Sequence, residues 1–234
     1  MKHRRMVLIG AVVAVVVVVV AAGAVYAYSF ASRVNQPHKA SGPAIDCGTQ
    51  VAASGLRSFS IVPAQTTASY KVHENLIIHN QPSTDAVGKT QDVSGTFSIR
   101  TNQSPLVAAL NVTVNLSTLT TDEAMRDRYV RNNALQTDAY PNATFVSTCT
   151  QGMPASYSEG QEITFKMVGN LTMHGKTNQE VFSVVGKLSG DTVTGTATTT
   201  LFMTDFGIEP PNLANVAIAE DRTQVTLEFT AKEG

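Results

Sequence analysis

The sequence of 234 residues has no tryptophan, and only 6% of its residues are aromatic and 15% are charged. It also lacks familiar catalytic motifs, because it has no G-x-S-x-G nucleophile elbow, no H-E-x-x-H zinc motif and no isolated carboxylate pair with an obvious role. Asp205-Phe206-Gly207 resembles the magnesium motif of kinases, but the glycine-rich and catalytic loops of kinases are missing. We therefore predict that the chain is not an enzyme.

Basic residues are scarce after residue 40. That part of the chain holds all 18 acidic residues but only 12 of the 17 basic ones, so its net charge is −6. Proteins that bind nucleic acid neutralise phosphates with a basic surface. This charge has the opposite sign, so we predict that nucleic acid is not a partner.

One long apolar run covers residues 6–28 and follows Lys2, Arg4 and Arg5. As a helix, about 23 residues rise roughly 34 Å, which is enough to cross a hydrocarbon core of about 30 Å. The basic cluster before the run favours a cytoplasmic N-terminus. Residues 1–31 are therefore predicted to be a cytoplasmic basic end and a transmembrane signal-anchor.

This prediction makes the chain a single-pass membrane protein whose C-terminal part lies outside the cytoplasm. Tyr26, Tyr28 and Phe30 stand where aromatic side chains gather at the membrane interface. The alternative is a cleaved signal peptide, because the small residues at 22–24 could accept a peptidase. Residues 32–54 are rich in Pro, Gly and Ser and are predicted to be a flexible linker, which leaves residues 55–234 as one domain.

The chain has only two cysteines, Cys47 and Cys149. Both lie on the predicted exported side, where disulfides form. We expect them to pair, which would close a loop of about 100 residues and stabilise the fold by roughly 4–5 kcal/mol in the chain-entropy account. Two unpaired thiols are the alternative.

Apolar and polar residues alternate with a period of two in the predicted domain, most clearly at 108–116 and 163–173, which is typical of strands with one buried face. Weaker alternation predicts strands at 68–73, 95–100, 143–148, 181–188, 192–203 and 224–231. One helix is predicted over 123–132, with Thr120 and Glu123 at the spacing of a capping box. At least eight strands with one short helix predict an all-β antiparallel barrel or sandwich.

Four sequence blocks in order carry a resemblance to a known family. They are Ser69-Tyr70-Lys71-Val72 followed by Val93-Ser94-Gly95-Thr96-Phe97, then the segment 126–131 with Asp138-Ala139-Tyr140-Pro141-Asn142-Ala143-Thr144-Phe145, then Val168-Gly169-Asn170-Leu171-Thr172-Met173-His174-Gly175, and finally Asp205-Phe206-Gly207-Ile208. Together these blocks resemble the YceI-like family over roughly residues 60–232.

The resemblance implies an eight-stranded, lipocalin-like antiparallel barrel that holds a long isoprenoid chain, of the quinone or polyprenol type, in an apolar tunnel. The sequence departs from the family pattern in three places. Ala134-Leu135-Gln136 replaces a pair of aromatic residues, Thr204 or Met203 replaces a basic residue, and Pro210-Pro211 interrupts a loop. If these positions shape the mouth of the tunnel, they bear on which ligand is bound.

The candidate ligand-binding residues are the apolar members of the alternating strands. We expect the lining to consist of Tyr70, Val72, Phe97, Ile99, Leu110, Val112, Val114, Phe165, Met167, Leu171 and Met173. Which alternating face points inward stays open at this stage, because an outward face packed on a helix would have the same pattern. Arg126 and Arg128 are candidate entrance residues, where an arginine could meet a lipid head group; a solvated helix face is the alternative.

We predict a membrane-tethered, extracytoplasmic protein that sequesters or carries an isoprenoid lipid, with no cofactor and no metal. The sequence points to no protein partner. The main rival is a solid-packed envelope domain that binds no ligand and serves in structure or interaction. A more remote rival is a haem or metal module that uses His73, His79 or His174, although their spacing is unlike that of metal ligands and His174 lies in a predicted turn.

Overall fold

The computed structural model describes residues 45, 47, 54–76, 81–101, 105–213 and 217–234. The chain divides into two compact units, Met1–Pro37 and His38–Gly234, and all described residues belong to the second. The predicted membrane span at residues 6–28 lies outside the described residues, and the domain boundaries at 31 and 54 stay predictions. Within the described ranges, no helix has the length and apolarity needed to cross a bilayer.

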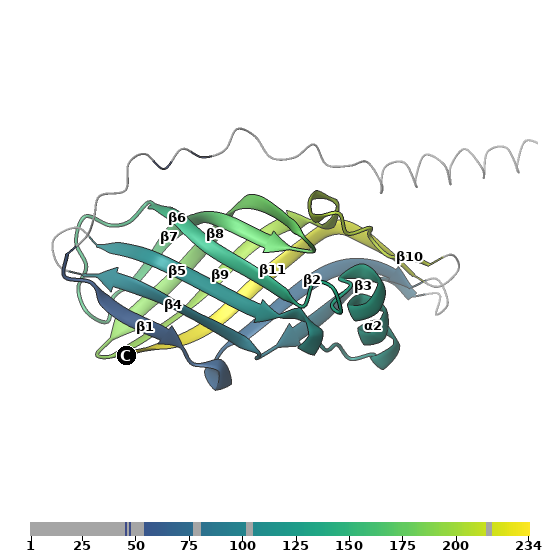
Figure 1. Cartoon of the computed structure of the whole chain (residues 1–234), viewed down its shortest axis with the longest axis horizontal. Helices are drawn as coiled ribbons and strands as arrows, with labels where there is room; N and C mark the ends of the chain where they lie inside the picture. Colours follow the sequence, from purple (N-terminus) through teal and green to yellow (C-terminus); the bar gives the residue numbers. More distant parts are fainter. Residues whose placement is uncertain (1–44, 46, 48–53, 77–80, 102–104, 214–216) are drawn as a thin grey trace, which may run out of the picture. The chain divides into compact units, whose positions relative to one another are not determined.

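The described part is almost entirely β structure (Figure 1). Its strands are β1 (Arg57–Ile61), β2 (Thr67–Leu76), β3 (Gln81–Thr90), β4 (Val93–Arg100), β5 (Leu106–Asn115), β6 (Asn142–Gln151), β7 (Glu162–Met173), β8 (Lys176–Ser189), β9 (Thr192–Phe202), β10 (Asn212–Leu213) and β11 (Ala217–Glu233). The helical elements are η1 (Pro63–Gln65), η2 (Leu116–Thr118), α2 (Ala124–Tyr129), η3 (Val130–Ala134) and η4 (Met203–Phe206).

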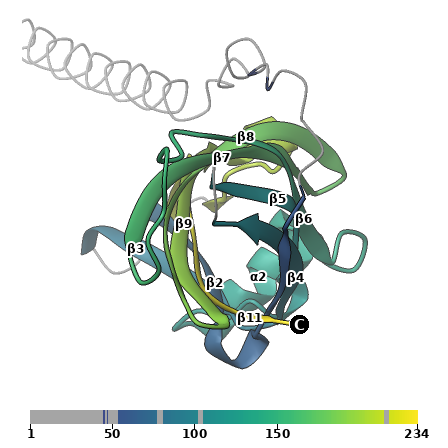
Figure 2. The same ribbon diagram turned by 90° about the vertical axis from the view of Figure 1, so that its left-hand side faces the viewer.

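Eight of these strands form a closed antiparallel ring. The pairing runs β1-β4-β5-β6-β7-β8-β9-β11, and β11 returns to β1 through the register Phe59 opposite Glu233 and Ile61 opposite Ala231. Figure 2 shows the strands wound around a common interior. The eight-stranded antiparallel barrel that the family resemblance implied is therefore confirmed.

The remaining strands extend one end of the barrel. Strand β11 is 17 residues long, so beyond its pairing with β1 it also pairs with β2, which in turn pairs with β3. Pro63 begins η1 between β1 and β2, where a strand cannot continue its ladder without an N–H group. The backbone of Lys89 in β3 bonds to that of Thr120, so the segment that leads into α2 borders this end.

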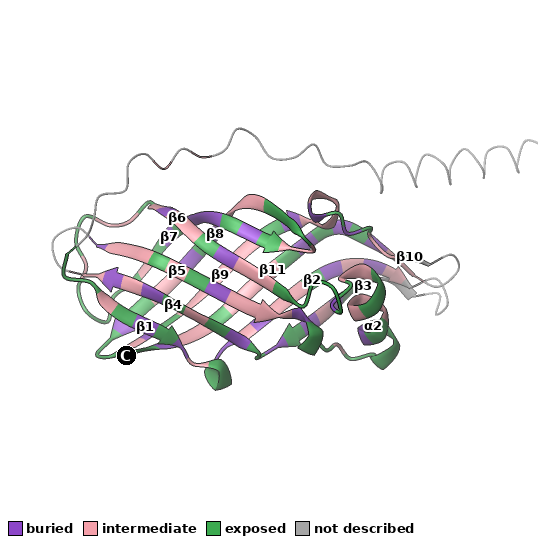
Figure 3. Ribbon diagram, viewed as in Figure 1, coloured by how far each residue is buried: buried purple, intermediate pink, exposed green. Residues whose placement is uncertain are grey.

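Burial follows the alternation of the strands. In β4, Val93, Phe97 and Ile99 are buried while Ser94 is exposed, and in β7 Phe165, Met167 and Leu171 are buried between exposed polar residues (Figure 3). The period-two pattern thus does mark the strands, as predicted, and the apolar face is the one that points into the barrel. Two clusters, one around Phe59 and Phe97 and one around Phe145 and Phe206, form most of the core.

The helix was predicted in the correct place but with the wrong cap. Helix α2 begins at Ala124 and passes into a π-helical turn at Val130. Its N-cap is Glu123, whose side chain accepts a hydrogen bond from the backbone N–H of Met125. The predicted capping box fails because Thr120 is held by the β-bridge to Lys89.

Candidate ligand-binding site

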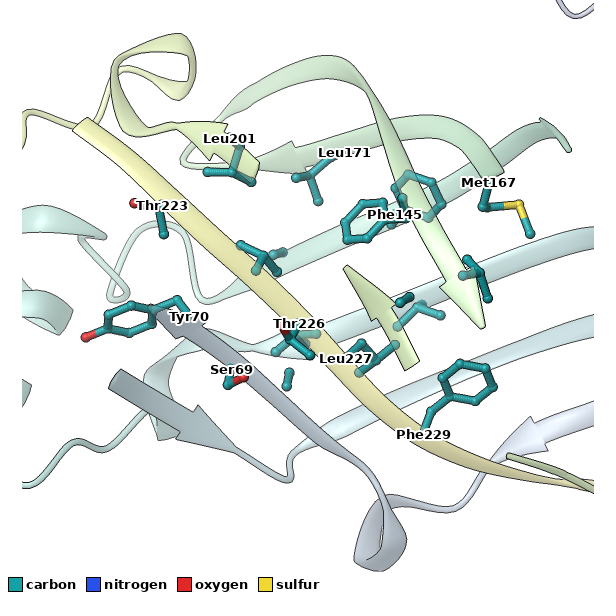
Figure 4. Close-up of a pocket in the computed structure, with 18 of the residues that line it drawn as sticks. Ser69, Tyr70, Phe145, Met167, Leu171, Leu201, Thr223, Thr226, Leu227 and Phe229 are labelled. Carbon is teal, nitrogen blue, oxygen red and sulfur yellow. The ribbon is translucent and has the colours of Figure 1, made fainter. Parts of the chain in front are cut away.

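The interior of the barrel contains a cavity of about 650 Å³. This volume is within the usual range for small-molecule sites, about 300–1,000 Å³. Its wall is made almost wholly of apolar side chains from β2, β4, β5, β6, β7, β8, β9 and β11. Figure 4 shows side chains from several of these strands around one space, among them Phe145, Met167, Leu171 and Leu201.

All eleven residues predicted as lining from the sequence lie on the wall of this cavity: Tyr70, Val72, Phe97, Ile99, Leu110, Val112, Val114, Phe165, Met167, Leu171 and Met173. The face that was left open at the sequence level is therefore settled as the inward one. That these residues bind a ligand stays a prediction.

Sequence reasoning missed the parts of the wall that β6, β8, β9 and β11 supply. The cavity is lined by Ala197 and Leu201 of β9 and by Thr223, Val225 and Leu227 of β11. The inward positions of β9 include small residues in a stretch of threonines, so apolarity gave a weak signal there. The alternation in 224–231 was the available signal, and it was used only to assign a strand.

One end of the cavity lies beside α2 and carries charge. Arg126 of α2 donates from its guanidinium to Glu74 of β2 at 2.6 Å, and it also pairs with Asp122 one turn earlier. The side chains of Arg126 and Glu74 retain 19% and 9% exposure, so the pair is largely removed from water. Arg126 thus lies at the cavity, as the entrance hypothesis requires, whereas Arg128 is exposed and outside the cavity wall.

Asp127 holds the loop before α2 in place. Its buried carboxylate accepts hydrogen bonds from the backbone N–H and the hydroxyl of Thr121, both at 2.7 Å. Arg131 donates to the carbonyl of Leu119 at 2.8 Å. The charged residues of this segment therefore do more than form the i, i+4 pair between Asp122 and Arg126. Their bonds to residues outside the helix fix α2 over the end of the barrel.

Tyr70 brings a hydroxyl into the same end of the cavity. Its oxygen is buried and has no hydrogen-bond partner among the described residues. Burial raises the pKa of Tyr70 to about 12; the charge of Arg126 acts against this rise, and the nearby carboxylates add to it. The phenol therefore stays protonated at physiological pH and keeps its ability to donate.

His73 and His174 do not form a metal site in the described ranges. His73 bonds through Nδ1 to Asp85 at 3.0 Å on the outer wall, and His174 bonds through Nδ1 to the carbonyl of Phe206 at 3.1 Å. His174 lies in the turn between β7 and β8, as predicted. No group of three metal-ligating side chains occurs among the described residues, and His79 lies outside them.

The predicted disulfide is confirmed. Cys47 and Cys149 are bonded, with their Cα atoms 5.6 Å apart and 102 positions apart in sequence. Close by, the side-chain amide of Gln179 in β8 exchanges two hydrogen bonds with the backbone of Ile45. Ile45 and Cys47, inside the linker predicted as flexible, are thus fastened to β8 and β6.

Each of the three departures from the family pattern places at least one residue on the cavity wall. Ala134, Leu135, Met203 and Pro211 all belong to its wall. Thr204 instead faces β11, where its N–H and hydroxyl both donate to the buried carboxylate of Asp221. The residues that distinguish this chain from the general pattern therefore alter the space available to a ligand.

Solved structures with this fold have low sequence identity to the chain. The structure of BcnA from Burkholderia cenocepacia has a TM-score of 0.57 and 19% identity, and the comparison covers 74% of this chain and 99% of that one. A domain from Saccharophagus degradans, described as a polyisoprenoid binding domain implicated in plant cell wall breakdown, has a TM-score of 0.60 and 13% identity over 76% of this chain and 99% of that one. At these identities the likeness establishes the fold.

Sequence relatives are closer but cover less of the molecule. A UPF0312 protein of Shewanella baltica (strain OS185) is 33% identical over 130 residues, which are 53% of this chain and 64% of the relative. A UPF0312 protein of Pseudomonas putida (strain KT2440) is 31% identical over 141 residues, which are 57% of this chain and 69% of the relative. The match thus spans just under two thirds of the Shewanella relative. Residues 59–231 match the YceI-like domain, and the chain belongs to the YceI-like family.

Proposed function

We propose that the protein is a binding protein that holds a long, apolar isoprenoid lipid of the quinone or polyprenol type inside its barrel. The observation that carries this proposal is the cavity of about 650 Å³ with its apolar wall. A solid-packed barrel, the main rival, would fill this space with side chains. The polyisoprenoid binding domain with the same fold supports the same ligand class.

Burial alone supplies the binding energy. Each CH₂ group moved from water into an apolar environment contributes about 0.8 kcal/mol. A chain of several isoprene units could therefore be bound without any covalent step, and the protein needs no catalytic group. The largely apolar wall also explains the low number of fixed polar contacts that the site offers.

The binding domain is proposed to act outside the cytoplasm, tethered to the membrane by residues 6–28. The apolar length of that segment and the basic residues before it support this arrangement. The disulfide between Cys47 and Cys149 supports an oxidising compartment. A tether of this kind would keep the barrel near the bilayer from which its ligand comes.

The proposal is tested by identifying what the protein carries. The full chain would be expressed in a cell that makes quinones and polyprenols, purified in a detergent without isoprenoid chains, and extracted with organic solvent for mass spectrometry. We expect an isoprenoid in about stoichiometric amount. An empty extract, from protein that also takes up no added quinone, would overturn the proposal.

A blocking variant makes the test specific for the cavity. Ala197 lines the cavity from β9, so Ala197→Phe should fill part of it and remove most of the bound lipid. Thr194 lies on the same strand with an exposed side chain, and Thr194→Phe is the matched control that should keep the lipid. Equal lipid content in the two variants would place the lipid outside the barrel.

A further inference from the structure

Two hydroxyl groups in the cavity wall lack partners. The Tyr70 hydroxyl and the Thr223 Oγ1 are both buried, and neither has a hydrogen-bond partner within the described part of the chain. Both residues line the cavity. A buried polar group left unpaired costs about 1–3 kcal/mol, so two such groups in a largely apolar wall indicate that a ligand group bonds them.

The two hydroxyls lie at the same end of the barrel. In the pairing of β2 with β11, Tyr70 is opposite Val225 and Thr223 is opposite Val72. Tyr70 and Thr223 are therefore diagonal neighbours on the inward face. The Cα atoms of such neighbours are roughly 7–8 Å apart. Figure 4 shows both side chains on these adjacent strands. The Tyr70 ring extends over Gly88 of β3, on the side of β2 away from β11, so the two oxygens are separate hydrogen-bonding points at this end.

The position of the Tyr70 ring is fixed by its neighbour on β3. Tyr70 pairs with Gly88, and a Cβ atom placed on Gly88 would lie 2.2 Å from Cε1 of Tyr70. The ring thus fills the space that a side chain would take on β3. The hydroxyl is held in place before any ligand arrives, which lowers the ordering cost of binding.

The charges near this end select against an anionic ligand group. The charged wall residues beside α2 are three acids and one base: Glu74, Asp122, Glu123 and Arg126. The one guanidinium is already paired with both Glu74 and Asp122. A phosphate or diphosphate placed here would face net negative charge with its only nearby cation already engaged.

Cationic wall residues occur instead at the opposite end of the barrel. Arg100 ends β4 and Lys187 lies near the end of β8, beside the turn that packs against β1. Strand β11 runs the whole way between the two ends: Ala219 is opposite Glu74, while Glu233 is opposite Phe59. At about 3.3 Å per residue the 14 intervening steps span roughly 45 Å, so no single head group touches both ends.

We propose that the α2 end of the cavity binds an uncharged, oxygen-bearing head group of the lipid through the hydroxyls of Tyr70 and Thr223. This inference rests on the proposed function and narrows its ligand class to isoprenoids with a carbonyl or hydroxyl head. Each protein hydroxyl can donate or accept, so a quinone carbonyl and a polyprenol hydroxyl both fit. Polyprenyl phosphates are excluded from this end.

The test compares four ligands of similar chain length: an isoprenoid quinone, a polyprenol, a polyprenyl phosphate and an isoprenoid hydrocarbon without a head group. Their dissociation constants are measured for the full chain and for two variants: Tyr70→Phe, which removes the hydroxyl, and Thr223→Val, which replaces it with a methyl group. A net hydrogen bond of about 1–1.4 kcal/mol corresponds to a loss of about 5- to 10-fold in affinity. We expect that loss for the quinone, the polyprenol or both, and no change for the hydrocarbon.

Two controls separate the hydroxyls from general effects. Tyr140→Phe and Thr200→Val make the same chemical changes at residues that lie outside the cavity wall, and they should leave all four affinities unchanged. The melting temperature of the ligand-free variants is the second control. Removing an unpaired buried hydroxyl should not lower it, whereas removal of a structural hydroxyl would.

The outcomes distinguish this inference from the proposed function. If the hydrocarbon and the head-bearing lipids bind equally well to the parent and both variants, the head-group site is wrong while the lipid cavity stands. Tighter binding of the phosphate than of the polyprenol, abolished by Lys187→Gln, would move the head to the other end and also overturn the inference. If none of the four ligands binds the parent, the proposed function itself fails.

Discussion

The ring of Tyr70 on β2 occupies the place where a side chain on Gly88 of β3 would stand. The two residues are directly opposite in the antiparallel pair, and a Cβ atom on Gly88 would lie 2.2 Å from Cε1 and 2.6 Å from Cζ of Tyr70. Gly88 is therefore required by a close approach rather than by a turn, since it lies within a regular strand.

This relationship predicts that Gly88→Ala destabilises the domain. The added methyl group must push the tyrosine ring aside, and overpacking of this kind costs about 1–3 kcal/mol. Denaturant unfolding of the parent and the variant measures the loss. A matched control is Gly186→Ala on β8, where the nearest atom to a new Cβ is the carbonyl oxygen of Thr194 at 3.6 Å, an ordinary contact.

A double-mutant cycle identifies the cause. In a Tyr70→Ala background the new methyl group has room, so Gly88→Ala should cost much less than in the parent. If the cost of Gly88→Ala is the same in both backgrounds, the clash with the ring is not its source.

The ion pair between Arg126 and Glu74 predicts a second effect on stability. Arg126→Ala leaves the carboxylate of Glu74 in a largely buried position without its guanidinium. Breaking a fully buried pair costs about 3–5 kcal/mol, and we expect about 2–3 kcal/mol here because Arg126 keeps some contact with water. The free energy of unfolding is the measurement, and Arg128→Ala, on the exposed side of the same helix, is the control.

Replacement of the second partner completes this test. Combining Arg126→Ala with Glu74→Gln removes the stranded charge, so the double variant should be more stable than Arg126→Ala alone. A double variant that is no more stable would show that the loss comes from the packing of the arginine side chain.

Strand alternation made the barrel and part of its wall predictable from the sequence. Leu110, Val112 and Val114 have a period of two with polar residues between them, and the structure places all three on the cavity. The alternation could not show which face was inward, because the pattern is the same for a sheet that packs on a helix. The pairing of β11 with β1, which closes the ring, supplied that information.

Several parts of the molecule could not be read from local patterns. Strand β1, which closes the ring with β11, was not predicted. Strand β3 was not predicted, because Thr84, Asp85 and Gly88 interrupt any apolar alternation, and the strand is held by its long register with β2. The polar end of the cavity was also missed, although Arg126 was proposed as an entrance residue. Glu74 and Thr223 reach that end only through the pairing of β2 with β11, a relation between residues about 150 positions apart.

The disulfide predicts dependence of stability on redox conditions. Cys47→Ser combined with Cys149→Ser should lower the free energy of unfolding in oxidising buffer, by as much as about 4–5 kcal/mol in the chain-entropy account for a loop of 102 residues. Thermal unfolding with and without a strong reductant measures the effect. In reductant the parent should approach the double variant, and equal melting temperatures in oxidising buffer would contradict a stabilising role for the bond.

Glu180 predicts a pH dependence whose sign can be derived. Burial, with a smaller contribution from the charge of Asp205, raises the pKa of Glu180 from 4.5 to about 7. The folded protein therefore holds this proton more tightly than the unfolded chain does. The stabilising contribution of protonated Glu180 is complete below about pH 4.5 and is lost as the pH rises through about 7.

Glu180→Gln removes this titration, because an amide stays neutral at every pH. We expect the variant to melt at nearly the same temperature as the parent at pH 4 and at a higher temperature at pH 8, with most of the change between pH 4.5 and 7. Glu162→Gln, at an exposed position on β7, is the matched control and should give no rise between pH 4 and pH 8. A difference between Glu180→Gln and the parent that is constant with pH would mean that Glu180 ionises in the folded barrel as readily as in water.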